Sequence, residues 1–346
     1  MVSIEILARK KYNMWFKDLT GFQEASAEEI REQLKIVGNQ FVSKANSRRF
    51  TFGRLEVASL DDLRGQNKNL SNYSASIQVR EIVANVQDLH SDVANSNALF
   101  QAASQFNLLE MVSPTVSPED GIDGYEYDYT QGPACAISCG AGTIYRNYFV
   151  EVNNQIGQTK NQQVDCLDLL GEVLNNEEEH LWIMQNGYAL ATRKGLESIS
   201  KTISALDEFG REALKGKIKT GIQWNTEVTI AHTRHLVSQI YCSALPVAYS
   251  SVEPSCWEAF ARLILEATYE STLHAAVLNM ENSGCNKVFL TLVGGGAFGN
   301  QESWILESLQ LALNKFKNTP LDVQVVSYGQ SNPNLKKCLE NITILD

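Results

Sequence analysis

The sequence predicts an α/β protein in which helices cover both faces of a central sheet. Two observations from the last third of the chain support this prediction. The segments 235–250, 287–293 and 322–328 are almost uniformly apolar, as strands buried on both faces are. Two segments with apolar residues at helical spacing, 256–280 and 302–316, separate them. This alternation is typical of a three-layer α/β/α sandwich, which binds ligands at the carboxyl ends of its strands.

The first 150 residues predict further elements in order. Within residues 1–70, Ser26 precedes acidic residues and apolar residues at helical spacing, which predicts a helical N-terminal extension. We expect one long strand or a pair of strands within 76–86, and another strand within 97–107. The small residues of 134–150 favour a closely packed helix.

A polar, charge-rich stretch over 151–235 is expected to be an insertion. It contains one helix within 161–174, a short strand within 181–190 and a further helix. We therefore divide the chain into an N-terminal extension, residues 1–70, and a main α/β domain, residues 71–346, that carries this insertion.

Charge and composition exclude several classes of partner. A formal net charge of −11 and a pI near 5.1 argue against binding to nucleic acid or to acidic membranes. No apolar run approaches the ~18 residues that cross a bilayer, and the first residues lack the apolar core of a secretory signal. Seven cysteines without a C-x-x-C pair favour a reduced setting. We therefore expect an intracellular, cytoplasmic protein with neither nucleic acid nor membrane as a partner.

Four glycines mark the junction between the apolar strand at 287–293 and the helix that follows it. Gly294, Gly295, Gly296 and Gly299 lie where successive backbone amides before a helix can surround phosphate oxygens. A P-loop is excluded because no Lys followed by Ser or Thr comes after the glycines. The alternative is an ordinary packed turn without a ligand.

Several blocks of sequence together resemble a known family. They read "FQAASQFNLLEM", "TQGPACAISCGAGTIYRNY", "YCSALPVAYS" and "VFLTLVGGGAFGN". In combination they resemble macrodomains, in particular the MavL-type ADP-ribosylhydrolases that remove ADP-ribose from arginine on ubiquitin, and more distantly the poly(ADP-ribose) glycohydrolases. The resemblance covers roughly residues 76–346 and implies a macrodomain-like fold with a mixed sheet. The Gln-Glu-Glu signature of the glycohydrolases is absent, which favours chemistry on a single ADP-ribose.

The resemblance also implies which residues contact ADP-ribose. Asn85 falls at the position of the adenine-contacting acid of macrodomains, and Tyr328 could stack on the adenine. Gln105 and Asn107 are candidates for the ribose hydroxyls, or they satisfy backbone groups at a strand end; Tyr328 could equally be a core aromatic. The complete predicted binding set is Asn85, Val86, Gln105, Phe106, Asn107, Gln131, Gly132, Gly294, Gly295, Gly296, Ala297, Phe298, Gly299, Asn300 and Tyr328.

A loop rich in acids and tyrosines, 113–131, offers candidates for catalysis. Hydrolysis at the anomeric carbon of ADP-ribose needs a carboxylate to activate water or to stabilise positive charge. Asp120 and Asp128 are the first candidates and Asp123 follows them. The alternative is that these acids cap turns, as "PEDG" does well.

Two functions from different classes are compatible with this pattern. The first is a hydrolase that removes mono-ADP-ribose from arginine on a protein such as ubiquitin. The second is a module that binds ADP-ribose on modified proteins without cleaving it. An α/β protein with an unrelated nucleotide ligand is a third, more distant reading.

No cofactor is expected besides the ligand ADP-ribose, and no metal, because His232 and His235 lack a third ligand. On the long helical segment, Glu258, Arg262, Glu266 and Glu270 recur every four residues, and we interpret them as a solvated, salt-bridged face.

Overall fold

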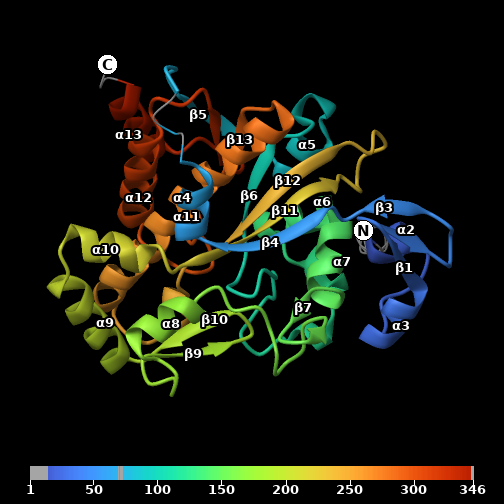
Figure 1. Ribbon diagram of the computed structural model, residues 1–346, viewed down its shortest axis with the longest axis horizontal. Coiled ribbons are helices and arrows are strands. Elements are labelled where there is room, and N and C mark those ends of the chain that lie inside the picture. The colour runs from blue at the N-terminus through green and yellow to red at the C-terminus, as the bar shows by residue number, and fades with distance from the viewer. Residues whose placement is uncertain (1–14, 69, 71–72, 344–346) are drawn as a thin grey trace, which may run out of the picture.

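The protein is built around a seven-stranded mixed sheet (Figure 1). The computed structural model describes residues 15–68, 70 and 73–343, so the N-terminal segment considered for a secretory signal lies almost wholly outside the described residues. Across the sheet the strands follow in the order β4 (Arg54–Ser59), β11 (Lys219–Glu227), β12 (Leu236–Cys242), β6 (Leu99–Ala103), β13 (Lys287–Leu290), β14 (Asp322–Ser327) and β5 (Gln78–Val83). The five strands from β12 to β5 are parallel, whereas β11 is antiparallel to both of its neighbours.

Helices cover both faces of this sheet, as predicted. One layer contains α4 (Leu60–Gln66), α11 (Pro254–Ser283) and α12 (Glu302–Lys315), and the other contains α5 (Val86–Ser91), α6 (Gln131–Ser138) and α7 (Gly140–Tyr148). Strand β6 illustrates the arrangement. Phe100 stacks on His90 of α5, while the next residue, Gln101, donates a hydrogen bond to Thr272 of α11. Consecutive strand residues point to opposite faces, so the two helical layers lie on opposite sides.

The N-terminal region differs from the predicted helical extension. It contains α2 (Trp15–Thr20) and α3 (Ala27–Gln33), which begins with the expected cap at Ser26. It continues as an antiparallel sheet of β1 (Leu34–Val37), β2 (Gln40–Ser43) and β3 (Arg49–Thr51), and then as β4 of the central sheet. The helical prediction is therefore wrong for residues 34–59. Short apolar runs separated by Gly and Asn favour hairpins, and this signal outweighs the helical spacing.

The N-terminal region shares a second hydrophobic core with the middle of the chain. Phe16, Ile30 and Phe41 are buried together with Leu109, Tyr125 and other residues up to Tyr148. The larger core fills the space between the central sheet and its helices. The division into domains at residue 70 stays a prediction, although β4 and the second core tie residues before it closely to residues after it.

The stretch 151–235 contains more strands than predicted. The expected single strand is a hairpin of β9 (Trp182–Gln185) and β10 (Tyr188–Ala191), because Asn186 and Gly187 form a two-residue turn with φ of 47° and 80°. The other elements of this stretch before β11 are β7 (Glu151–Val152), β8 (Gln155–Ile156), α8 (Asp168–Leu174), α9 (Arg193–Ala205) and α10 (Glu208–Lys215). Helix α13 (Pro333–Thr343) completes the described chain, in which no helix is both long and apolar enough to span a bilayer.

Candidate functional site

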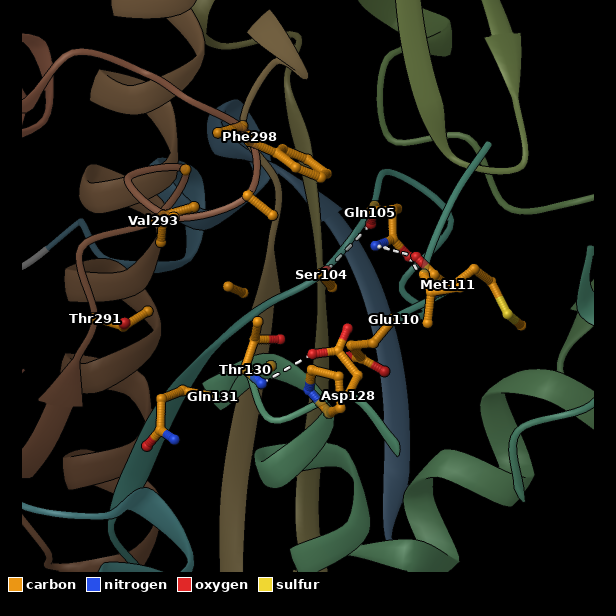
Figure 2. A pocket seen from close by; sticks show the side chains of 18 of the residues that line it. Ser104, Gln105, Glu110, Met111, Asp128, Thr130, Gln131, Thr291, Val293 and Phe298 are labelled. Carbon is orange, nitrogen blue, oxygen red and sulfur yellow. Dashed lines mark hydrogen bonds between the residues drawn. The ribbon is translucent and has the colours of Figure 1, made fainter. Parts of the chain in front are cut away.

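A cavity of about 250 Å³ opens where β6, β12 and β13 end at their carboxyl sides (Figure 2). This is the edge of the sheet at which the fold class predicts a ligand. Its walls come from segments that are far apart in the sequence. The lining residues are Ala103, Ser104, Gln105, Glu110, Met111, Val112, Asp128, Thr130, Gln131, Gly132, Pro133, Tyr188, Ala244, Tyr249, Thr291, Leu292, Val293, Gly294, Gly296, Ala297 and Phe298.

The glycine loop forms one wall of this cavity and offers it free amide groups. Four lining residues, Gly294, Gly296, Ala297 and Phe298, have backbone N–H groups with no acceptor among the described residues. Gly294 has φ of 80°, and a Cβ there would lie 2.5 Å from the Cβ of Ala244, so only glycine fits. Free amides in one bend next to a cavity are suited to bind an anion.

The remaining residues of the predicted loop shape it. The amide of Gly299 donates to the carbonyl of Gly296 at 3.1 Å, and the amide of Asn300 donates to that of Gly294 at 3.0 Å. The Asn300 side chain donates to the carbonyl of Leu245 at 2.8 Å. Gly295, Gly299 and Asn300 do not line the cavity.

Glu110 is the lining residue with the most unusual environment, and our sequence interpretation missed it. The residue is 2% exposed, and neither carboxylate oxygen has a hydrogen-bond partner among the residues that the structure describes. Burial raises the pKa of Glu110 to about 8, the nearby Arg146 opposes this rise, and the negative charge of Asp128 adds to it. The group is therefore mostly protonated at neutral pH. A carboxyl group kept neutral in a cavity can donate a proton.

A tight turn after β6 directs Glu110 into the cavity. Both the N–H and the carbonyl of Met111 pair with the side-chain amide of Gln105, at 2.7 and 3.2 Å. Leu108 adopts φ of 66° in this turn, which is uncommon outside glycine. Leu109 is buried in the second core, whereas Glu110 and Met111 both line the cavity. Gln105 thus lines the cavity, but its amide satisfies backbone groups.

The neighbouring predicted residues lie in the protein interior. Phe106 is part of the main core. Asn107 is fully buried, accepts from the amide of Leu109 at 3.1 Å and donates to the side chain of Gln163 at 2.8 Å. Neither lines the cavity.

Of the three predicted catalytic acids, only Asp128 reaches the cavity. It accepts a hydrogen bond from the amide of Thr130 at 2.8 Å and faces the same part of the cavity as Glu110 (Figure 2). Asp120 is exposed and accepts from the amide and hydroxyl of Ser117 at 2.7 and 2.9 Å, as a turn cap does. Asp123 lies outside the cavity, and burial raises its pKa.

A buried arginine, Arg146, lies near Glu110. Arg146 is fully buried, its guanidinium lies 3.5 Å from the centre of the Tyr241 ring, and its Nε donates to the carbonyl of Leu108 at 2.9 Å. Its Nη1 has no hydrogen-bond partner in the ranges that the structure describes. In the sequence, Glu110 and Arg146 are single charges within apolar runs, a signal that could have marked both.

Three aromatic rings, from Tyr188, Tyr249 and Phe298, form a further wall. Their centroids are 5.3 to 5.8 Å apart. The hydroxyl of Tyr188 donates to the carbonyl of Met111 at 2.6 Å, and burial raises its pKa. Of these three residues, only Phe298 was predicted. The Asn-Gly turn before Tyr188 is a sequence signal for the hairpin that places Tyr188 at the cavity.

A second, small hollow adjoins the cavity toward β14 and α5, where Val326 and Val86 line it. Gln131 lines both spaces, and its side-chain oxygen accepts from the amide of Val86 at 3.0 Å. Gly132 follows at the cavity wall, where a Cβ would lie 2.3 Å from the carbonyl oxygen of Ala103. Asn85 caps α5 by accepting from the amide of Gln87 at 2.9 Å. Val86 thus lies next to Gln131 at this hollow, whereas Asn85 lines neither space, and the assignment of both residues to ADP-ribose stays a prediction.

Tyr328 is 60% exposed and does not line the cavity, so it is not a core aromatic. Across the described ranges, no three His, Cys, Asp or Glu side chains are grouped as ligands of a metal ion would be.

The chain matches no protein-family model and no curated protein. Among solved structures it is similar to the poly(ADP-ribose) glycohydrolase from Thermomonospora curvata bound to the inhibitor ADP-HPD, at 12% identity and a TM-score of 0.43, covering 90% of this chain and 95% of that one. It is also similar to the poly(ADP-ribose) glycohydrolase from Deinococcus radiodurans in complex with ADP-ribose, at 8% identity and a TM-score of 0.43, covering 93% and 100%. These similarities are too distant to carry an argument about ligand or reaction.

Proposed function

We propose that this protein is an ADP-ribosylhydrolase that cleaves the N-glycosidic bond between ADP-ribose and an arginine side chain. The observation that carries the proposal is the placement of Glu110. A buried carboxyl group without a partner faces a cavity, next to a second carboxylate, Asp128, and opposite a loop of free amides. A module that only binds ADP-ribose has no need of this costly buried acid, so the arrangement favours an enzyme.

The diphosphate of ADP-ribose would bind to the glycine loop. The free amides of Gly294, Gly296, Ala297 and Phe298 supply hydrogen bonds to phosphate oxygens. Helix α6 begins at the same cavity with Gln131 and Gly132, so its positive end also favours an anion there. The adenosine half would extend past Gln131 toward Val86 and the end of β5, which requires the Gln131 side chain to move.

The sugar to be cleaved would lie between the three aromatic rings and the carboxyl pair. Asp128 would take a proton from a water molecule, whose oxygen then bonds to the anomeric carbon. As the bond from that carbon to nitrogen breaks, its electron pair goes to the departing guanidine, which takes the proton of Glu110 and leaves as guanidinium. The products are ADP-ribose and unmodified arginine, and a proton passing from Asp128 to Glu110 restores the starting state.

Arginine as the modified side chain and ubiquitin as the modified protein come from the sequence resemblance. The site is compatible with arginine, because a carboxylate such as Asp128 at the cavity can also bind a guanidinium group through charge-assisted hydrogen bonds.

The test uses the full chain and a protein labelled with ADP-ribose on arginine, with ubiquitin as one substrate. We expect release of free ADP-ribose, measured by mass spectrometry, and little release from serine-linked or glutamate-linked ADP-ribose. Glu110→Gln should abolish the release while calorimetry still detects binding of ADP-ribose.

Binding without release by the wild-type chain would identify a module that only binds ADP-ribose. No binding at millimolar ADP-ribose would refute both functions. Full activity of Glu110→Gln would remove Glu110 from the mechanism and, with it, the observation on which the proposal rests.

A further inference from the structure

We infer that Glu24, in the N-terminal region, is a positioning residue that holds Asp128 beside Glu110. Its side chain fixes the start of the segment that ends at Asp128. The expected effect on catalysis rests on the proposed function. The expected effect on the position of Asp128 beside Glu110 can be tested without a substrate.

The carboxylate of Glu24 accepts hydrogen bonds from two amides at the beginning of this segment and from Tyr148 of α7. One oxygen accepts from the amide of Ile122 at 2.9 Å and from the hydroxyl of Tyr148 at 2.6 Å. The other accepts from the amide of Asp123 at 2.8 Å. At Gly121, φ is 87° and a Cβ would lie 2.3 Å from the Glu24 carboxylate, so the backbone reaches this acid only because the residue is glycine.

A series of hydrogen bonds leads from these amides to the cavity. The carbonyl of Ile122 accepts from the amide of Tyr125, and the carbonyl of Tyr125 accepts from the amide of Asp128, each at 3.2 Å. The hydroxyl of Tyr125 in turn accepts from the amide of Glu110 at 2.9 Å. One short helical turn, Asp123–Tyr127, therefore contacts Glu24 at its start and leads directly into Asp128 at its end, with Tyr125 bound to Glu110 between them.

The core supports the same connection. Ile122 and Tyr125 are buried in the second core with Phe16 and Ile30 of the N-terminal region. Trp15 adds a hydrogen bond from its indole nitrogen to the carbonyl of Asp123 at 3.2 Å. The N-terminal region is thus part of the support of the site, which gives a function to residues that the sequence assigned to an extension.

The test compares Glu24→Gln with Glu32→Gln, an exposed acid of the same region that serves as matched control. Glutamine keeps the size of Glu24 but places an amide donor against backbone N–H donors. The readout is the titration midpoint of the Glu110 carboxyl group. It is measured by infrared spectroscopy of the carboxyl band, which is assigned by its loss in Glu110→Gln. The charged or titratable groups that influence or are influenced by Glu110 are Asp128, Arg146, Tyr125, Cys135 and Tyr241.

We expect Glu24→Gln to lower the titration midpoint of Glu110 by about one pH unit, because the charge of Asp128 moves away and water enters. The rate of arginine-linked hydrolysis should fall by about tenfold or more, since small displacements of reacting groups are costly. The alkaline limb of its pH–rate profile should move to lower pH with the Glu110 midpoint. The Kd for ADP-ribose should stay within about twofold, because the glycine loop is untouched. Glu32→Gln should change none of these quantities.

A Glu110 midpoint in Glu24→Gln equal to that of the wild type would overturn the inference. If Glu24→Gln does not fold, Trp15→Phe decides: it removes one hydrogen bond to the same segment and should shift the midpoint in the same direction by less, and an unchanged midpoint would again overturn the inference. Absence of hydrolysis by the wild-type chain would refute the proposed function only, because the infrared titration needs no substrate.

Discussion

Two groups of buried charges in this protein differ in whether their carboxylates have ionic partners. Between α4, α10, α11 and α12, every buried carboxylate has cationic partners: Glu270 contacts Arg64 and Lys315 at 2.7 Å, and Glu266 contacts Arg211 at 2.5 Å. At the cavity, Glu110 is equally buried, but within the described part of the chain no ion pair or hydrogen bond reaches its carboxyl oxygens. The first group ties helices together, whereas the second leaves a reactive group facing open space.

The pKa shifts of the two acids follow from these surroundings. Burial alone would raise the pKa of Glu270, but hydrogen bonds from Arg64 and Lys315 and the nearby charge of Lys215 more than compensate and hold it well below its ordinary value. For Glu110, burial outweighs the opposing charge of Arg146, and the pKa rises to about 8. A buried charge with ionic partners therefore indicates a role in stability, and an unpaired buried charge next to a cavity indicates a role in binding or catalysis. The sequence interpretation of a salt-bridged face is confirmed, but Glu266 and Glu270 are not solvated, because α4 and α10 cover that side of α11.

The largest effect should come from Glu110→Gln. Glutamine has nearly the same shape but cannot donate a carboxyl proton, so kcat for arginine-linked ADP-ribose should fall by about 10²- to 10⁴-fold. Single-turnover hydrolysis measures this loss, and calorimetry with ADP-ribose should show an affinity close to that of the wild type. A loss of affinity instead of rate would mean that Glu110 binds the ligand and takes no part in the chemistry.

Glu270→Gln should affect stability and leave the site unchanged. It removes one partner from Arg64, Lys215 and Lys315, and we expect the free energy of unfolding to fall by about 3 kcal/mol. Urea denaturation measures this change. The control is Glu307→Gln, which breaks an exposed pair with Arg262 and should cost less than about 1 kcal/mol. Equal effects of the two variants would contradict the contrast between a buried network and a surface pair.

The two acids should also give stability opposite dependences on pH. The folded-state pKa of Glu270 is depressed, so its contribution is present above pH 4.5 and is lost as pH falls below that value. The folded-state pKa of Glu110 is raised from 4.5 to about 8, so its contribution is present below pH 4.5 and is lost as pH rises toward 8. Glu110→Gln should therefore stabilise the protein at pH 7, on the order of 3 kcal/mol. Denaturation midpoints measured between pH 4 and 8 test both signs. A midpoint of Glu110→Gln equal to that of the wild type at pH 7 would contradict the raised pKa of Glu110.

The sequence predicted the layers of the fold well because these depend on local patterns, and the binding role of the glycine loop stays a prediction. Uniformly apolar strands and a run of glycines are visible in a few consecutive residues. Glu110 could not be assigned in this way, since its role depends on the burial of Leu109 and Met111 in a core that the N-terminal region helps to build. For the same reason the acid-rich loop identified a region correctly but could not show which of its acids faces the cavity.

The smallest effect is expected for Asp120→Asn, although Asp120 was a first candidate for catalysis. Two acids of this one loop have different surroundings: Asp120 caps a turn at Ser117 and is exposed, whereas Asp128 lines the cavity. Asparagine retains one oxygen for the cap, so Asp120→Asn should cost less than about 1 kcal/mol of stability and leave kcat unchanged. Asp128→Asn, the same change eight residues later, should lower kcat by about 10²-fold because asparagine cannot accept the proton of water. Hydrolysis rates of the two variants, measured side by side, would contradict this assignment if Asp120→Asn were the slower enzyme.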